Sequence, residues 1–405
     1  MPIIEKLCPV TRISSGPFHH FFGYYEKSPW SLDGRYLLGI RVEPSHWFPG
    51  PDDRAEIGAF DLEREGHWQP FAQTGAWNWQ QGAMLQWLDA FSERHVIFNT
   101  RTDNGYGSSI LDVEASKKRS LPLPVYVLVP GGRYALSLNH ARLLATHPTI
   151  GYAERGGGPS LELAPHDDGI YVMDLSTGSW RLLLSLAEVS DFQHDASMDG
   201  AIQWISHMAF NPSGTRMVFK HRWSHKPADQ ACWSHRLMAA NANGTHLTVL
   251  EDSPGLISHP IWRDDETVLG WTHHNGQAGY YLYGDRTGEV QPLGADVLDE
   301  NGHCSYSPDG RWLLTDTYPE AKFWEFGDSV AGPSRSRATV ILYHPDTNTR
   351  INIGHFSAPS QYQGVSRCDL HPRWSRDGQQ VCIDSTHEGD RQIYLLDVAD
   401  IVRSR

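Results

Sequence analysis

The stretch Ser307-Pro308-Asp309-Gly310 separates two short apolar segments, and related stretches recur along the chain. Proline fixes φ for a turn, aspartate bonds the local backbone and glycine takes the left-handed position, so each copy predicts a tight hairpin. The other clear copies are Ser31-Leu32-Asp33-Gly34, Asn211-Pro212-Ser213-Gly214 and Ser375-Arg376-Asp377-Gly378.

A third strand follows each hairpin, and a fourth usually follows the third. Gly169-Ile-Tyr-Val-Met-Asp-Leu175 and Ser179-Trp-Arg-Leu-Leu-Leu184 are one such pair. Four antiparallel strands in a unit of roughly 40 to 55 residues are typical of a propeller blade. The sequence therefore predicts an all-β, seven-bladed β-propeller that occupies residues 1–405 as one domain. The alternative is a β-sandwich or two smaller domains, and the regular repeat favours the propeller.

The two ends of the chain complement each other. The last unit ends after three strands, at Val398, whereas Val10-Thr-Arg-Ile13 has no hairpin of its own. An unpaired edge strand invites aggregation, so closing the ring is favourable. We expect the N-terminal strand to complete the last blade.

Composition excludes some partners. The formal charge of −14 argues against a nucleic acid or an acidic membrane as partner. The five cysteines are odd in number and lack CxxC spacing, which is typical of reduced thiols in a cytoplasmic protein. The N-terminus has no apolar signal region and no long apolar run follows, so we expect a cytoplasmic protein.

Polar residues gather where the predicted hairpins open. The first strand of a blade lines the axis, so the start of strand one and the end of strand two should surround one mouth. Strand-one starts carry His207, His259, His303, His371 and Gln80. Strand-two ends carry Arg41, Arg101, Arg142, His221, Arg222 and Tyr318. Taken singly, each histidine is more simply a hydrogen-bonded spacer and each arginine a partner of a nearby carboxylate.

Taken together, these residues suit metal and carboxylate chemistry. Imidazoles with a carboxylate suit Mn²⁺ or Zn²⁺, and Asp369 and His371, two apart on a strand, point to one side. We expect His259 and His371, with Asp369 or His303, to bind one divalent ion. Arg222 and Arg236 are candidates to hold a substrate carboxylate, and His207 or His221 is the candidate base. Arg41, Gln80, Arg101, Arg142 and Tyr318 are the further candidates for substrate binding.

Several stretches resemble known propellers. The repeats resemble the TolB-like propellers, and the C-terminal half resembles the oligogalacturonate lyase family. The similar stretches are Ile205-Ser-His-Met-Ala-Phe-Asn-Pro212, Val218-Phe-Lys-His-Arg-Trp223 with His235-Arg236-Leu237, Ile257-Ser-His-Pro-Ile-Trp262 and His371-Pro-Arg-Trp-Ser-Arg-Asp-Gly378.

The resemblance implies a seven-bladed lyase that binds Mn²⁺ through three histidines and a glutamine. By position, His259 and His371 match two of these ligands, Asp369 falls on the third histidine and Ser366 on the glutamine. Gln361 or Gln363 is the alternative to Ser366. The implied function is metal-assisted β-elimination on a uronate-containing saccharide, with an acidic oligosaccharide as substrate. The alternative is a non-catalytic TolB-like propeller that binds a glycan or a protein partner on the same face.

Overall fold

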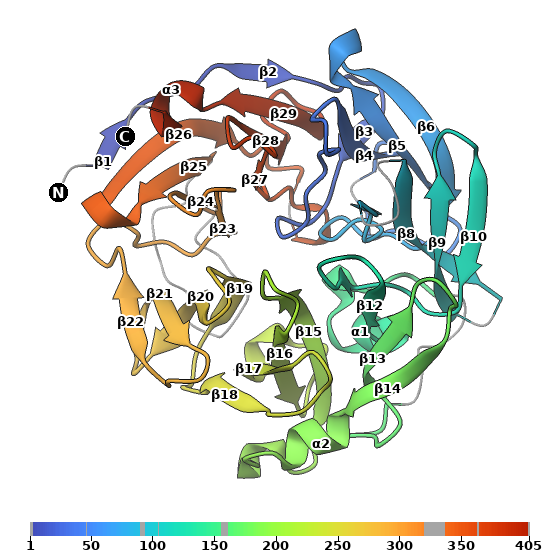
Figure 1. Cartoon of the computed structure of the whole chain (residues 1–405), viewed down its shortest axis with the longest axis vertical. Coiled ribbons are helices and arrows are strands. Elements are labelled where there is room, and N and C mark those ends of the chain that lie inside the picture. Colours follow the sequence, from blue (N-terminus) through green and yellow to red (C-terminus); the bar gives the residue numbers. More distant parts are fainter. Residues whose placement is uncertain are drawn as a thin grey trace.

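The computed structural model describes residues 3–45, 47–89, 94–103, 105–154, 161–319, 337–362 and 364–403. Within these residues, seven sheets are arranged as blades around a central axis (Figure 1). The predicted mainly-β, seven-bladed propeller is confirmed. In the same residues, no helix is both long enough and apolar enough to span a membrane.

The strands follow one another from the axis to the rim in each blade. Blade 1 holds β3 (His19–Phe21), β4 (Tyr36–Val42), β5 (Ala55–Asp61) and β6 (His67–Thr74); blade 2 holds β7 (Gln86–Trp87), β8 (His95–Thr102), β9 (Gly105–Asp112) and β10 (Lys117–Leu121); blade 3 holds β11 (Val127–Leu128), β12 (Tyr134–Ser137), β13 (Gly169–Asp174) and β14 (Trp180–Ser185); blade 4 holds β15 (Ile202–Phe210), β16 (Arg216–Ser224), β17 (Ser234–Asn241) and β18 (Thr248–Glu251). Blade 5 holds β19 (Ile257–Trp262), β20 (Thr267–His274), β21 (Gln277–Gly284) and β22 (Val290–Leu293); blade 6 holds β23 (Ser305–Tyr306), β24 (Leu313–Asp316), β25 (Arg337–His344) and β26 (Thr349–Ser357); blade 7 holds β27 (Arg373–Trp374), β28 (Gln380–Ser385) and β29 (Gln392–Asp397). The helices are α1 (His140–Thr146), α2 (Leu186–Asp191) and α3 (Ala399–Val402).

The N-terminal strand closes the ring, as predicted. β2 (Val10–Arg12) pairs antiparallel with β29 and completes blade 7. The sequence did not indicate a further strand, β1 (Ile3–Glu5), which pairs parallel with β26 on the rim of blade 6. Figure 1 shows both strands along the outer edge of the C-terminal blades. The two pairings join the start of the chain to its last two blades.

The hairpin turns have the expected geometry. In blade 6, the Ser307 hydroxyl donates to Asp309 at 2.5 Å, the Gly310 N–H donates to the Ser307 carbonyl at 2.8 Å, and Gly310 has φ of 72°. That positive φ suits glycine, which has no Cβ to clash.

Tryptophans beside these turns pack between blades. Trp30, Trp262, Trp312 and Trp374 are all buried. The Trp374 indole of blade 7 donates to the Ser305 carbonyl of blade 6 at 3.4 Å, and the Trp262 indole of blade 5 donates to the Ala209 carbonyl of blade 4 at 3.2 Å. Burying such large aromatic surfaces stabilises the contacts between blades.

Candidate metal and substrate site

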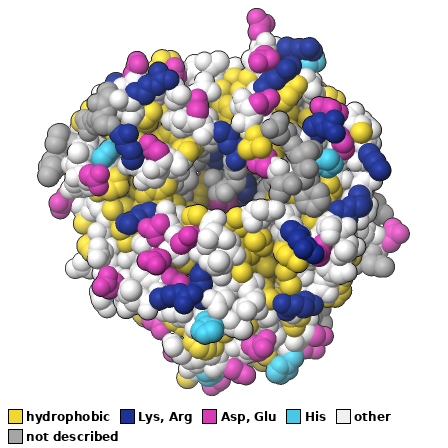
Figure 2. Space-filling view, in the orientation of Figure 1, with side chains coloured by type: hydrophobic (Ala, Val, Ile, Leu, Met, Phe, Trp, Pro, Cys, Tyr) yellow, Lys and Arg dark blue, Asp and Glu magenta, His cyan; other side chains and the backbone are white. Residues whose placement is uncertain are grey.

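A polar hollow lies at the axis where the hairpins open. Figure 2 views one end of the axis and shows the ring hollowed at its centre. Blades 4, 5 and 6 contribute to its lining, together with the β3–β4 connection of blade 1, the segment after α1 in blade 3, and the segments before blades 2 and 7. Its lining residues are Tyr24, Gln80, His147, Thr149, Ile150, His207, Lys220, Arg222, Gln230, Ser258, His259, His303, Tyr318 and Arg367.

Three of the predicted histidines share an unusual backbone conformation. His207, His259 and His371 have φ of 54°, 48° and 43°. The pairing of β15 with β16 shifts between Ser206 and Ala209, and that of β19 with β20 shifts between Ser258 and Ile261. His207 and His259 therefore sit in bulges, which bend a strand and redirect a side chain. The left-handed conformation costs a non-glycine residue roughly 1–2 kcal/mol, and such strain is concentrated at functional sites.

His303, Asp369 and His371 form a cluster that could hold a metal ion. One potential ligand atom of each lies within 4.8 Å of those of the other two. The rings of His303 and His371 are 4.3 Å apart, centroid to centroid, and all three side chains are buried. The Tyr24 ring packs against both histidines, at 6.2 Å from His303 and 5.2 Å from His371.

The chemistry of this cluster fits a divalent cation. Nε2 of His371 is buried and has no hydrogen-bond partner among the residues that the structure describes. A buried nitrogen without a partner is costly unless something else binds it. Two imidazoles and a carboxylate are suitable ligands for Mn²⁺ or Zn²⁺. The residues present therefore fit the metal that the sequence indicated.

His259 lies beside this cluster and belongs to another set of contacts. Its ring centroid is 4.1 Å from that of His303, which places it next to the predicted ligands. Its Nδ1 lies 3.0 Å from the Ser258 hydroxyl and 3.2 Å from Oδ1 of Asn301, and its Nε2 lies 3.1 Å from the Tyr318 hydroxyl. The compact cluster thus contains three of the four predicted metal ligands, and the role of His259 as a ligand stays a prediction.

Burial keeps His207, His259 and His371 neutral. Desolvation lowers the pKa of His207, His259 and His371 well below the usual value, and neighbouring positive charges and histidines add to the effect. Neutral imidazoles can bind a metal ion or accept a proton. For His207, the neighbouring charges are Lys220 and Arg222.

One wall of the hollow, formed by Lys220 and Arg222, is basic. Lys220 and Arg222 lie two residues apart on β16 and so face the same side of the sheet. Arg222 is 1% exposed, donates to Nδ1 of His147 at 2.8 Å and lies 5.0 Å from the Trp233 ring. Arg367 also lines the hollow, and its Nε donates to Asp369 at 2.9 Å. A chain of charge −14 thus places three cationic side chains around one hollow.

Lys220 and Arg367 were not among the predicted site residues, whereas Tyr24 stood at a predicted strand-one start without an assigned role. The period of a strand could have identified Lys220, because it lies two positions before Arg222. Arg367 precedes blade 7 in a loop, where no periodicity applies. Tyr24 belongs to a stretch with a recognisable pair of phenols, yet its position among three histidines depends on tertiary packing.

The same strand period takes His221 and Arg236 away from the hollow. His221 lies between Lys220 and Arg222, so it faces the other side of the sheet. Its Nε2 lies 2.7 Å from Oε1 of Gln203, and Nε of Arg236 donates to its Nδ1 at 3.2 Å. Arg236 also donates to the carbonyls of Val189 and Gln193 at 2.7 and 2.9 Å. This geometry gives both residues structural partners instead of a place at the mouth.

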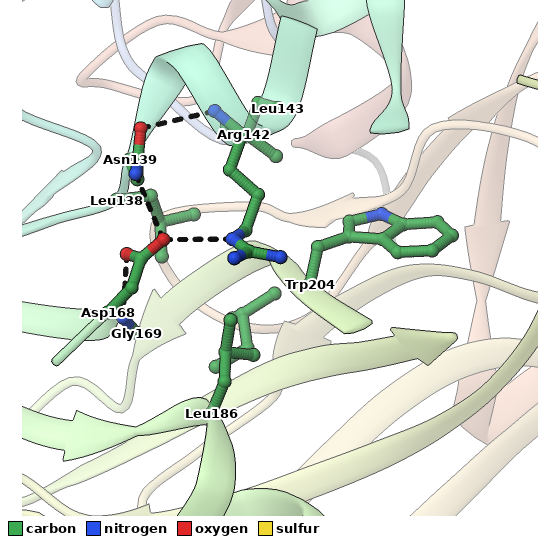
Figure 3. A pocket seen from close by; sticks show the side chains of 9 residues that line it. Leu138, Asn139, Arg142, Leu143, Asp168, Gly169, Leu186 and Trp204 are labelled. Atoms are coloured by element: carbon green, nitrogen blue, oxygen red, sulfur yellow. Dashed lines mark hydrogen bonds and ion pairs between the residues drawn. The ribbon is translucent and has the colours of Figure 1, made fainter. Parts of the chain in front are cut away.

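Arg142 is also tied into the scaffold (Figure 3). The sequence placed it at the end of strand two, but β12 ends at Ser137 and Asn139 caps α1. Nε of Arg142 donates to Asp168 at 2.8 Å, and its Nη1 donates to the carbonyls of Glu162 and Gln203 at 3.1 and 3.0 Å. Its guanidinium thus joins α1 to blade 4.

Two further predicted arginines lie away from the lining of the hollow. Arg41 pairs with Glu56 at 2.5 Å and packs on the rings of Phe18 and Trp68. Arg101 donates to the Ala153 carbonyl and packs on Tyr106. Of the predicted substrate-binding residues, the structure brings Gln80 and Tyr318 to the hollow.

The glutamine implied by the family resemblance has no clear counterpart. Ser366 is buried, and its carbonyl accepts a hydrogen bond from Arg391 at 2.6 Å. Gln361 is exposed, and Gln363 lies outside the described residues. The compact cluster includes His303, which the resemblance did not imply as a ligand.

Comparisons with known proteins show the fold. No family model matches the sequence, and no curated protein matches it either. An oligogalacturonate lyase structure from Vibrio parahaemolyticus is similar, with a TM-score of 0.66, 14% identity and coverage of 96% of this chain and 94% of that one. An oligogalacturonate lyase in complex with manganese matches with the same TM-score and identity, over 96% of this chain and 93% of that one. A puromycin-hydrolyzing peptidase from Mycobacterium tuberculosis matches with a TM-score of 0.51 and 15% identity, over 98% of this chain but 55% of that one.

Proposed function

We propose that this propeller is a metal-dependent lyase that performs β-elimination on a uronate-containing oligosaccharide. The observation that carries the proposal is the buried cluster of His303, Asp369 and His371 beside a basic hollow on the axis. The structural likeness to an oligogalacturonate lyase that binds manganese supports the same class of chemistry.

His303, Asp369 and His371 would hold the cation. A divalent cation beside the uronate carboxylate would withdraw charge and stabilise the anion that forms when the α proton leaves. Arg367, whose Nε donates to Asp369, would orient the Asp369 carboxylate toward the cation.

The basic wall would bind and orient the substrate. Lys220 and Arg222 lie on one face of β16, so both can approach one substrate carboxylate. Arg222 is held by His147 and by the Trp233 ring, which fixes its direction. A fixed cation stabilises developing negative charge without reorganising during the reaction.

His207 is the candidate base. It lines the hollow, and its Nδ1 lies 2.8 Å from the Ser206 hydroxyl. The Ser206 hydroxyl can accept a hydrogen bond from the tautomer of His207 that carries its proton on Nδ1. In that tautomer Nε2 has a lone pair and can take a proton. In the other tautomer Ser206 donates to Nδ1. Because burial lowers its pKa, His207 is neutral near pH 7 and can accept the α proton.

One observation favours the non-catalytic alternative. The buried Ser366 stands where the family resemblance implies a glutamine ligand, so the ligand set differs from the one implied. A propeller that binds an acidic glycan on the same face would keep the basic wall without needing elimination chemistry.

An elimination assay separates the two. The protein is incubated with pectic, alginate-like and glucuronan oligosaccharides, and the ultraviolet absorbance of the unsaturated product is followed. We expect product that disappears after chelation and returns with Mn²⁺. Binding of an oligosaccharide without product, on all three substrate types, would favour the non-catalytic alternative.

A further inference from the structure

The carboxylate of Asp316 makes two contacts with His303. Its Oδ1 accepts the backbone N–H of His303 at 2.6 Å. Nδ1 of the His303 ring lies 3.0 Å from Oδ1 and 3.1 Å from Oδ2 of the same carboxylate. Both side chains are 2% exposed, so water does not compete for these bonds. An ionised carboxylate only accepts hydrogen bonds, so this contact places the ring proton on Nδ1.

The backbone is shaped to allow this approach. A Cβ at Gly302 would lie 1.8 Å from the Asp316 carbonyl oxygen, so no other residue fits there without movement. Because residue 302 is a glycine, the segment that contains Gly302 and His303 can lie directly against the end of β24.

With its proton on Nδ1, His303 presents the lone pair of Nε2 to the site. The Tyr318 hydroxyl lies 3.2 Å from this nitrogen and 3.1 Å from Nε2 of His259. A single lone pair cannot serve a hydroxyl proton and a metal ion together. Tyr318 and a cation therefore compete for the same atom.

From these contacts we propose that Asp316 and Tyr318 control His303 as a metal ligand. Asp316 is a positioning residue that fixes the tautomer with Nε2 free to bind, and Tyr318 occupies Nε2 until a cation displaces it. Displacement releases the Tyr318 hydroxyl toward the substrate side of the hollow. This inference rests on the proposed metal site and does not require elimination activity.

Asp316→Asn tests the positioning role. The amide oxygen can still accept the backbone N–H of His303, but the amide NH₂ then faces Nδ1 and donates to it. The ring proton moves to Nε2, which blocks the ligand position. We expect Mn²⁺ affinity, measured by titration calorimetry, to fall by about 10- to 100-fold, the usual effect of losing such a partner. Thermal unfolding of the metal-free variant controls for damage to the fold.

Tyr318→Phe is the opposing variant. Removing the competing hydroxyl should tighten Mn²⁺ binding by up to about tenfold, the equivalent of one hydrogen bond. Unchanged affinity in Tyr318→Phe would contradict competition, and a loss of affinity would make the hydroxyl part of the metal site. Equal affinity in wild type and Asp316→Asn would contradict the positioning role while leaving the metal site itself intact.

A readout without metal keeps the tautomer testable by itself. Nitrogen-15 chemical shifts distinguish a protonated ring nitrogen from one with a lone pair, and a His303→Gln protein assigns the His303 signals. We expect the proton on Nδ1 in wild type and on Nε2 in Asp316→Asn. A proton on Nε2 in the metal-free wild type would overturn the inference. Failure of elimination activity alone would count against the proposed function and not against this assignment.

Discussion

His207 and His259 occupy the same place in blades 4 and 5, each at positive φ inside a bulge of the strand that lines the axis. His371 has the same backbone conformation before β27 of blade 7. Repeated strain at one position of three blades is difficult to explain by packing alone, and it directs each imidazole to the axis.

The strain predicts an unusual stability order at His207. Replacing it by glycine should leave the protein about 1 kcal/mol more stable than replacing it by alanine, because glycine adopts positive φ without a clash. Urea unfolding of the two variants measures the difference. His303, whose φ is not positive, supplies the control: there alanine should be the more stable choice. If the alanine variant had the larger free energy of unfolding at both positions, the idea that His207 is strained would be contradicted.

Buried histidines outside the site predict acid sensitivity. His140 is stacked 4.5 Å from the Tyr152 ring, and burial lowers its pKa to about 3. Its folded-state pKa is thus below the unfolded value of 6.5, so the unfolded chain binds the proton first. Stability should fall as the pH drops from about 6.5 toward 3, by about 1.4 kcal/mol per pH unit for this group.

In His140→Phe, the free energy of unfolding should fall less steeply with decreasing pH, by about 1.4 kcal/mol per pH unit. Urea unfolding between pH 7 and pH 4.5 measures this slope. His194→Gln is the control, because His194 is exposed and its bond to Asp199 raises its pKa. An unchanged acid slope in His140→Phe would show that this histidine does not stay neutral in the folded protein.

The metal cluster predicts different results for two neighbouring histidines. His371→Ala removes a member of the compact cluster and should abolish Mn²⁺ retention. His259→Ala removes a neighbour whose nitrogens contact Ser258, Asn301 and Tyr318, so some Mn²⁺ retention should remain. Metal analysis of the purified variants compares them. Retention by His371→Ala and loss by His259→Ala would place the ion elsewhere.

Arg222 and Arg236 make a matched pair on adjacent strands. Arg222→Lys keeps the positive charge at the hollow but removes the paired N–H donors with which a guanidinium binds a carboxylate. We therefore expect kcat/KM for an acidic oligosaccharide to fall by about 10- to 100-fold. Arg236→Lys should mainly lower the free energy of unfolding, because Arg236 holds the carbonyls of Val189 and Gln193. A fall in kcat/KM for Arg236→Lys, with only a loss of stability for Arg222→Lys, would instead place Arg236 in the substrate site.

The repeated turns make this fold readable from the sequence. Ser307-Pro308-Asp309-Gly310 and its relatives mark hairpins, and a last unit with three strands indicates where Val10–Arg12 must pair. β1 was not predicted, because it has only three residues, pairs in parallel on the rim and shows no sequence pattern that would identify it as a strand.

The site was partly predictable for a similar reason. Hairpin geometry indicated that His207, His259, His303 and His371 share one end of the axis. The same geometry predicted the wrong place for Arg142 and His221. Asn139 caps a helix, so Arg142 lies on α1 and not at the end of a strand. His221 follows the alternation of β16 and faces the side of the sheet opposite to Arg222. Contacts such as that of Asp316 with His303 join segments 13 residues apart and depend on the tertiary fold.

The central claim is that His303, Asp369 and His371 bind one divalent cation. An anomalous difference map from crystals grown with Mn²⁺, with data collected on both sides of the manganese edge, tests it most directly. The account predicts one strong peak between these three side chains, with Nε2 of His371 within bonding distance. A map without a peak there, or with the peak at other side chains, would contradict it.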